Sequence, residues 1–99
     1  MIDQIALDRV TLVRDLISEY EDEIARERTR LDALYVEWAN TQRSAIELAE
    51  DGEVLRARQA RQEARALQHR IEAAEERIDR MEQLLAMFRR KLLEVQRAR

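Results

Sequence analysis

The sequence predicts an all-α protein, a two-helix antiparallel coiled-coil hairpin that dimerises into a four-helix arrangement. The 99 residues include one glycine and no proline, so the residues that β-turns and irregular loops require are almost absent. Apolar residues return at alternating spacings of three and four along two long stretches, which is the pattern of a coiled-coil seam. The single glycine, Gly52, separates the two stretches.

The first predicted helix spans residues 3–50. Asp3 is placed to cap it, because a carboxylate accepts a hydrogen bond from a free backbone N–H of the first turn. Two polar residues, Glu27 and Thr41, interrupt an otherwise apolar seam. The seam residues are Ala6, Val10, Val13, Ile17, Tyr20, Ile24, Glu27, Leu31, Leu34, Trp38, Thr41, Ala45 and Leu48.

The predicted turn comprises residues 51–52. Glycine tolerates the positive φ that closes the C-terminus of a helix, so the chain is expected to reverse at Gly52. A competing break lies at Asn40 and Thr41. The seam stays in phase across that point, which favours the reversal at Gly52.

The second predicted helix spans residues 53–97, and its seam has no polar interruption. Alanines dominate its first part and leave space that the Trp38 side chain of the first helix can fill, as close packing requires. The seam residues are Ala57, Ala60, Ala64, Leu67, Ile71, Ala74, Ile78, Met81, Leu85, Phe88, Leu92 and Val95.

Folding at Gly52 predicts a register in which position i faces roughly position 102 − i. Val13 then lies near Phe88, and Trp38 meets Ala64. The same register places several like charges opposite each other, for example Glu21 opposite Glu82 and Arg14 opposite Arg89. Exposed pairs contribute only about 0.2–1 kcal/mol each, so the apolar seam is expected to decide the pairing.

Charge and composition exclude several classes of protein. Residues 1–51 carry a net charge of −7 and residues 52–99 a net charge of +4, for a total of −3. Halves of opposite sign attract, which suits two helices of one chain. The absence of cysteine excludes disulfides and thiolate metal sites. No apolar run approaches the roughly 20 residues of a membrane span, and no secretory leader is recognised; we expect a cytoplasmic protein.

Apolar residues outside the seam are concentrated near the two termini. An isolated pair of helices would leave many of them in water, and contiguous exposed apolar surface marks an interface. We therefore expect this end to bind a second copy, with a homodimer as the first choice, or another protein. An open alternative is that the hairpin itself covers part of the set. The candidate partner-binding residues are Ile5, Leu12, Leu16, Leu84, Met87 and Leu93.

The second helix carries a run of arginines, which is the residue type that follows phosphates in nucleic-acid binding. With its glycine-containing turn and arginine-bearing return helix, the chain resembles in outline the helical arm of seryl-tRNA synthetases. That resemblance implies an alternative function as a nucleic-acid-binding arm, against a solvated, ion-paired face. The candidate residues are Arg56, Arg58, Arg61, Arg65 and Arg70.

Catalytic and metal-binding patterns are not recognised. The only histidine, His69, lies opposite the seam, and the inward-facing Glu-x-x-His spacing of helical metal bundles is missing. Neither a nucleophilic triad nor a glycine-rich phosphate loop can be assembled, so we expect no catalysis, no cofactor and no metal. The sequence thus indicates a non-enzymatic coiled-coil interaction module of the scaffold, adaptor or assembly/secretion chaperone type, similar in shape to helical-hairpin stalk proteins of flagellar-type export systems.

Overall fold

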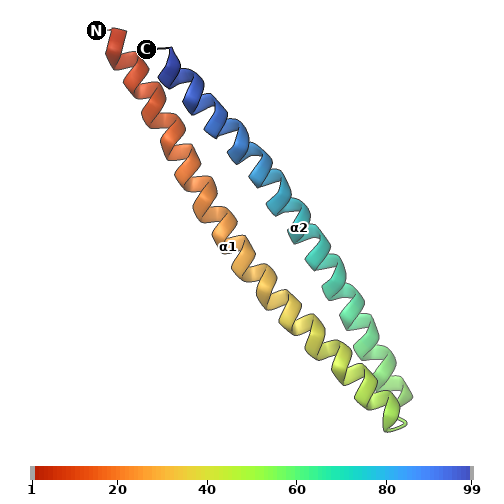
Figure 1. Ribbon diagram of the computed structural model, residues 1–99. Coiled ribbons are helices and arrows are strands. Elements are labelled where there is room, and N and C mark those ends of the chain that lie inside the picture. Colours follow the sequence, from red (N-terminus) through yellow and green to blue (C-terminus); the bar gives the residue numbers. More distant parts are fainter. Residues whose placement is uncertain (1, 99) are drawn as a thin grey trace. The chain divides into compact units, whose positions relative to one another are not determined.

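The prediction of an all-α helical hairpin is confirmed by a computed structural model that describes residues 2–98 (Figure 1). Helix α1 spans Ile2–Glu50 and helix α2 spans Val54–Arg97, and these described residues contain no strand. The side chains of residues 2, 3 and 6 are not described, so the predicted cap at Asp3 and the first seam position lie outside the described side chains. Neither helix, over the residues described, is long and apolar enough to cross a membrane.

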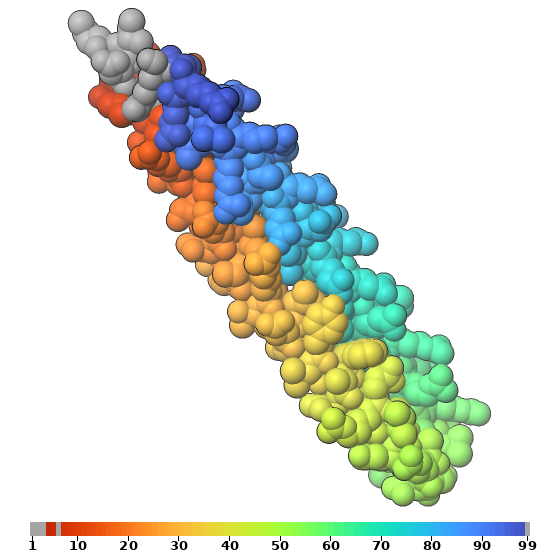
Figure 2. All heavy atoms as spheres, in the orientation of Figure 1, coloured from red at the N-terminus to blue at the C-terminus, as the bar shows by residue number. Residues whose placement is uncertain are grey.

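The chain divides into two compact units. The terminal unit contains Met1–Glu27 and Arg77–Arg99, and the turn unit contains Arg28–Glu76. Within each unit, a segment of α1 packs against an antiparallel segment of α2, and side chains fill the space between the two ribbons (Figures 1 and 2). Each unit therefore has its own part of the seam.

In the turn unit, every predicted seam position is buried or half-buried. Ala64 and Ala74 are the least exposed, at 2% and 1%. Trp38 is half-buried, and its indole nitrogen is buried without a hydrogen-bond partner. The buried positions are Ala45, Ala57, Ala60, Ala64, Leu67, Ile71 and Ala74.

In the terminal unit, every predicted seam position whose side chain is described is also buried or half-buried. The rings of Tyr20 and Phe88 pack in a tilted arrangement, with centroids 5.3 Å apart and planes at 56°. Aromatic pairs of this kind contribute about 0.5–1.5 kcal/mol beyond the area they bury. The buried positions are Val10, Val13, Ile24, Glu27, Ile78 and Leu85.

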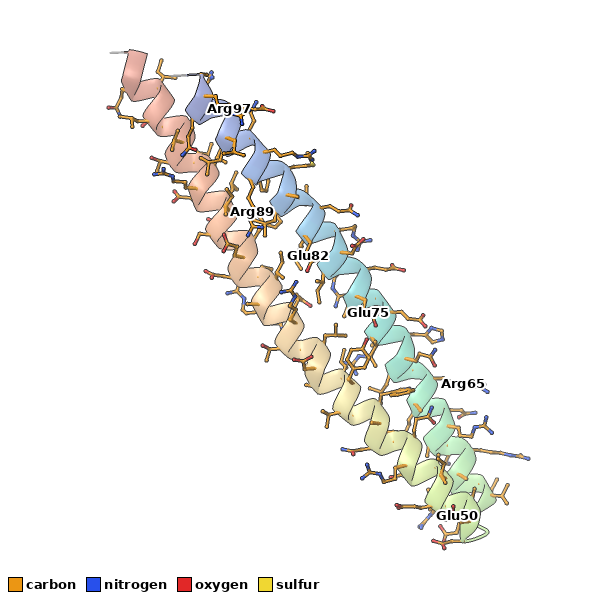
Figure 3. All side chains as sticks on the ribbon, in the orientation of Figure 1. Glu50, Arg65, Glu75, Glu82, Arg89 and Arg97 are labelled. Carbon is orange, nitrogen blue, oxygen red and sulfur yellow. The ribbon has the colours of Figure 1, made fainter. Side chains whose placement is uncertain are left out.

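Some side chains that meet across the seam are not the ones that the predicted register pairs. The ring of Phe88 packs against that of Tyr20. Arg89, which was expected opposite Arg14, extends towards α1 and pairs with Glu21 at 3.9 Å (Figure 3). The cause is geometric, because side chains tilt towards the N-terminus of their own helix, so that contacts in an antiparallel pair join residues displaced along the axis. The displacement turns a predicted repulsion into an attraction.

The turn closes α1 in a Schellman motif. The Glu53 amide donates to the Leu48 carbonyl at 2.9 Å, and the Gly52 amide donates to the Ala49 carbonyl at 3.1 Å. These are the two hydrogen bonds of that motif, with Gly52 as the left-handed residue. Its φ is +78°, a backbone angle that residues with a Cβ adopt only at a cost in free energy.

We expect Gly52→Ala to lower the free energy of unfolding by about 1–2 kcal/mol, the cost of a left-handed backbone for an ordinary residue. The loss comes from the backbone alone, because no atom lies within 4 Å of the point that a Cβ would occupy at Gly52. Gly52→Asn is the matched control and should lose less, since asparagine tolerates this conformation. Urea unfolding followed by circular dichroism measures both; an alanine variant as stable as the wild type would contradict the assigned turn.

Candidate interaction surfaces

Glu27 is the buried carboxylate of the terminal unit, with 8% of its surface exposed. Its carboxylate lies 3.6 Å from the guanidinium of Arg77. Half of the Arg77 side chain is in solvent, which reduces the energy of the pair relative to a dry interior. The arrangement fits a structural role for Glu27.

A groove opens beside this pair on one face of the terminal unit. Its α1 wall is largely acidic, with Glu19 and Glu23, and its α2 wall carries Arg77 and Arg80. One face therefore presents opposite charges from the two helices. The lining residues are Glu19, Tyr20, Glu23, Arg26, Glu27, Arg77, Arg80, Met81 and Leu84.

Five of the six candidate partner-binding residues lie on this same face. Leu84 lines the groove itself. Met87 follows it by three positions. On α1, Leu12 and Leu16 each precede a groove glutamate by seven positions, and Ile5 precedes Leu12 by seven, a spacing that keeps residues on one flank of a helix. Most are more than half exposed, although Leu16 is half-buried and Leu84 is 36% exposed. We define the open-end face as Ile5, Leu12, Leu16, Leu84 and Met87.

Leu93 lies apart from the other five. It is 52% exposed and follows Arg89 by one helical turn, on the flank where Arg89 pairs with Glu21. The structure thus places one candidate residue on the opposite side of α2. A partner that contacts the open-end face does not reach it at the same time.

The five candidate nucleic-acid-binding arginines do not share one flank of α2. By helical spacing, Arg58, Arg61 and Arg65 lie on one flank, and Arg56 and Arg70 lie on another. Arg56 pairs with Glu53 at 3.1 Å. All five side chains are exposed, and Arg65 extends outward from α2 (Figure 3).

A second groove lies in the turn unit, and no pattern in the sequence predicted it. Ile46 and Val54 are 60% and 55% exposed on its walls, and both lie outside the seam on either side of Gly52. That pair of apolar residues flanking the turn is the signal that could have revealed it. We call it the turn groove, and it is lined by Gln42, Ala45, Ile46, Ala49, Val54, Ala57, Arg58 and Arg61.

A hydrogen bond crosses the turn unit on the flank of the turn groove. The Tyr35 hydroxyl donates to the Glu75 carboxylate at 2.5 Å, and Glu75 extends from α2 towards α1 (Figure 3). This hydrogen bond, followed by burial and the negative charge of Glu75, raises the pKa of Tyr35 above its ordinary value. Nothing in the sequence pattern singled out this pair, because both residues lie beside the seam.

We expect Glu75→Gln to lower the pKa of Tyr35, because a neutral amide accepts a weaker hydrogen bond and carries no charge. The raised pKa means that the hydrogen bond stabilises the fold below the ordinary tyrosine pKa of about 10, and that this contribution is lost as pH rises through the raised value. Absorbance titration of tyrosine measures the shift, with Glu76→Gln as the control. Identical titration curves for both variants would contradict the hydrogen bond.

Metal-ligating side chains do not converge within the described part of the chain. No group of three or more His, Asp or Glu residues is arranged to hold an ion among these residues. His69 is exposed, and its ring nitrogen lies 3.8 Å from the carboxylate of Glu72, one turn away. This arrangement is an ordinary surface contact of a charged helix.

The fold and its two grooves define a class of protein, a helical hairpin with exposed apolar and charged surface on its flanks. Comparison with protein-family models, with curated proteins and with solved structures found no match to this chain.

Proposed function

We propose that this chain is a non-enzymatic coiled-coil module for protein–protein interaction, of the scaffold, adaptor or assembly/secretion chaperone type. The open-end face is its binding surface, and the first partner is a second copy of the chain. The observation that carries the proposal is the placement of five apolar side chains on one face of the terminal unit, beside a groove with acidic and basic walls. Apolar surface with a charged border is typical of protein interfaces.

The free energy gained by burying the open-end face is comparable to the cost of bringing two copies together. Full burial of a leucine or methionine side chain contributes about 1.5–3 kcal/mol, and the members of the open-end face are about half exposed. A symmetric dimer would cover two such faces, and burial of each side chain would contribute on the order of 1 kcal/mol. For the five side chains of each face the total is about 10 kcal/mol, which is comparable to the cost of about 4–15 kcal/mol for immobilising two molecules. We therefore expect a dimer of at most moderate affinity, to which the charges of the groove also contribute.

The charges favour one arrangement of the two copies. A two-fold axis parallel to the helices places the α1 segment of one terminal unit against the α2 segment of the other. Glu19 and Glu23 of one copy then lie at the level of Arg77 and Arg80 of the second copy. An axis perpendicular to the helices brings like helices and like charges together instead. We therefore propose a parallel, four-helix pairing of the terminal units.

Sedimentation at tens of micromolar tests the proposal. We expect the wild-type chain to dimerise, and Leu12→Glu combined with Met87→Glu to weaken the dimer by at least about 100-fold, because four carboxylates would be buried in one interface. Val36→Glu combined with Leu55→Glu is the matched control, since these exposed residues lie in the turn unit. A monomeric wild type would contradict the homodimer; equal dimerisation of both variants would contradict the face.

A nucleic-acid-binding arm is the second candidate. The flank that holds Arg58, Arg61 and Arg65 supports it, and the separate position of Arg56 and Arg70 counts against it. Salt-sensitive retention of the chain on heparin would favour this function. Passage through the column at low salt would favour the protein-binding module.

A further inference from the structure

We propose that the turn groove is a docking site for an acidic amphipathic helix of a partner protein. This site lies in the turn unit, so it is distinct from the open-end face and does not depend on it. Its floor and α1 wall are apolar or uncharged, and its α2 wall is basic. The partner's apolar residues would pack in the groove, and its carboxylates would face the arginines of the rim.

The apolar part of the groove is exposed and continuous. Ile46 and Val54 are more than half in solvent, and Ala49 lies between them on the lining. The short alanine side chains of the seam, Ala45 and Ala57, form its floor and leave a hollow of about 480 Å³. A leucine-sized side chain can enter such a hollow, which is how grooves between helices receive an amphipathic helix.

The positive charge of the arginines beside the groove is not balanced by nearby carboxylates. Arg58 and Arg61 line the groove, and Arg65 lies one turn further along the same flank. Among the described residues, the side chains of these three arginines form no ion pair or hydrogen bond, unlike that of Arg56 on the other flank. The facing positions of α1 are Gln42, Ile46 and Ala49 and supply no carboxylate. The other flank of this unit mixes its arginines with Glu37, Glu47 and Glu63. Three arginines without a neighbouring carboxylate are thus gathered on the groove side, where their positive charge complements an acidic partner.

An acidic helix fits this surface better than nucleic acid does. Arg58, Arg61 and Arg65 span two helical turns, about 10 Å, and carboxylates at i, i+3 and i+7 of a docked helix repeat at matching intervals. The aliphatic side chains of Ile46 and Val54 line the site. They give a nucleic-acid backbone nothing to bind, and the described residues of the groove include no aromatic ring on which a base could stack.

Fluorescence anisotropy with the full chain and a labelled probe tests the site. The probe is a synthetic helix of about 15 residues, long enough to fold on binding, with one leucine stripe flanked by glutamates. We expect binding at low salt, weakened about tenfold or more by the triple change Arg58→Glu, Arg61→Glu and Arg65→Glu, through the loss and reversal of three charge pairs. The matched control, Arg43→Glu with Arg90→Glu and Arg97→Glu, alters net charge equally on exposed positions outside the groove and should bind within about twofold of the wild type.

The apolar contribution has its own pair of variants. Ile46→Ser with Val54→Ser should weaken binding of the same probe several-fold, whereas Val36→Ser with Leu55→Ser, equally exposed but outside the groove, should leave it unchanged. Equal binding by the two serine variants, or by the two charge variants, would overturn the proposal. Tighter binding of poly(U) RNA or of phosphatidylserine vesicles than of the peptide, abolished by the triple change in the groove, would also overturn it and would assign the arginines to phosphate.

Discussion

Replacing Ile71 with alanine is expected to lower the free energy of unfolding by about 2–5 kcal/mol, the largest loss we expect from a single residue of this chain. Ile71 is 5% exposed in the seam of the turn unit. Its neighbours in the same seam include several alanines, which cannot extend to fill the space left behind. The variant loses both the transfer energy of the deleted carbons and the packing of the cavity lining.

Urea unfolding followed by circular dichroism measures this loss. Ile46→Ala removes the same atoms from a side chain that is 60% exposed, so we expect a change within about 0.5 kcal/mol. Small domains are stable by only about 5–15 kcal/mol, and the Ile71 variant should therefore unfold at a clearly lower urea concentration than the wild type. Equal stability of the two variants would show that the seams of the two helices do not pack against each other.

The opposite change, Ala64→Leu, is the second large effect. Ala64 is 2% exposed, and a larger side chain must push the helices apart or leave its preferred rotamer. Overpacking of this kind costs about 1–3 kcal/mol. Leucine is a good helix former, so helix propensity does not account for a loss.

A double-mutant cycle tests whether the loss of stability in Ala64→Leu depends on the large side chain of Trp38. We predict that Trp38→Leu destabilises the wild type but partly rescues Ala64→Leu, because the smaller side chain returns space to the seam. The coupling should reach about 0.5 kcal/mol or more. Additive losses would place Trp38 against other residues of the turn unit.

The sequence was sufficient to predict the fold class, the reversal and the seam. The two apolar seams, with residues at spacings of three and four, allowed one consistent pairing of the two helices. Gly52 was the one residue suited to the left-handed position of the turn. These features follow from periodicity and backbone sterics, which a sequence displays directly.

The individual side-chain contacts between the helices and the turn groove were not predictable in the same way. Heptad spacing fixes which side of each helix is buried, but the direction in which side chains tilt decides which residues meet. That tilt brings Arg89 to Glu21. The turn groove depends on how the alanine-rich seam lowers the surface between Ile46 and Val54, a feature that the spacing of residues along one helix does not report.

The reversal of the chain at Gly52 within one molecule is the feature on which both grooves and both units depend. The chain has no cysteine, so spin labels attach only to cysteines that are introduced. The positions chosen are Asp15→Cys and Arg90→Cys, both exposed in the terminal unit. With an excess of unlabelled protein to suppress contacts between molecules, electron spin resonance should detect a distance of about 20–40 Å, as expected for helices packed about 8–10 Å apart with labels on their outer sides. One continuous helix would separate the labels by about 110 Å, and the absence of a short distance would contradict the hairpin.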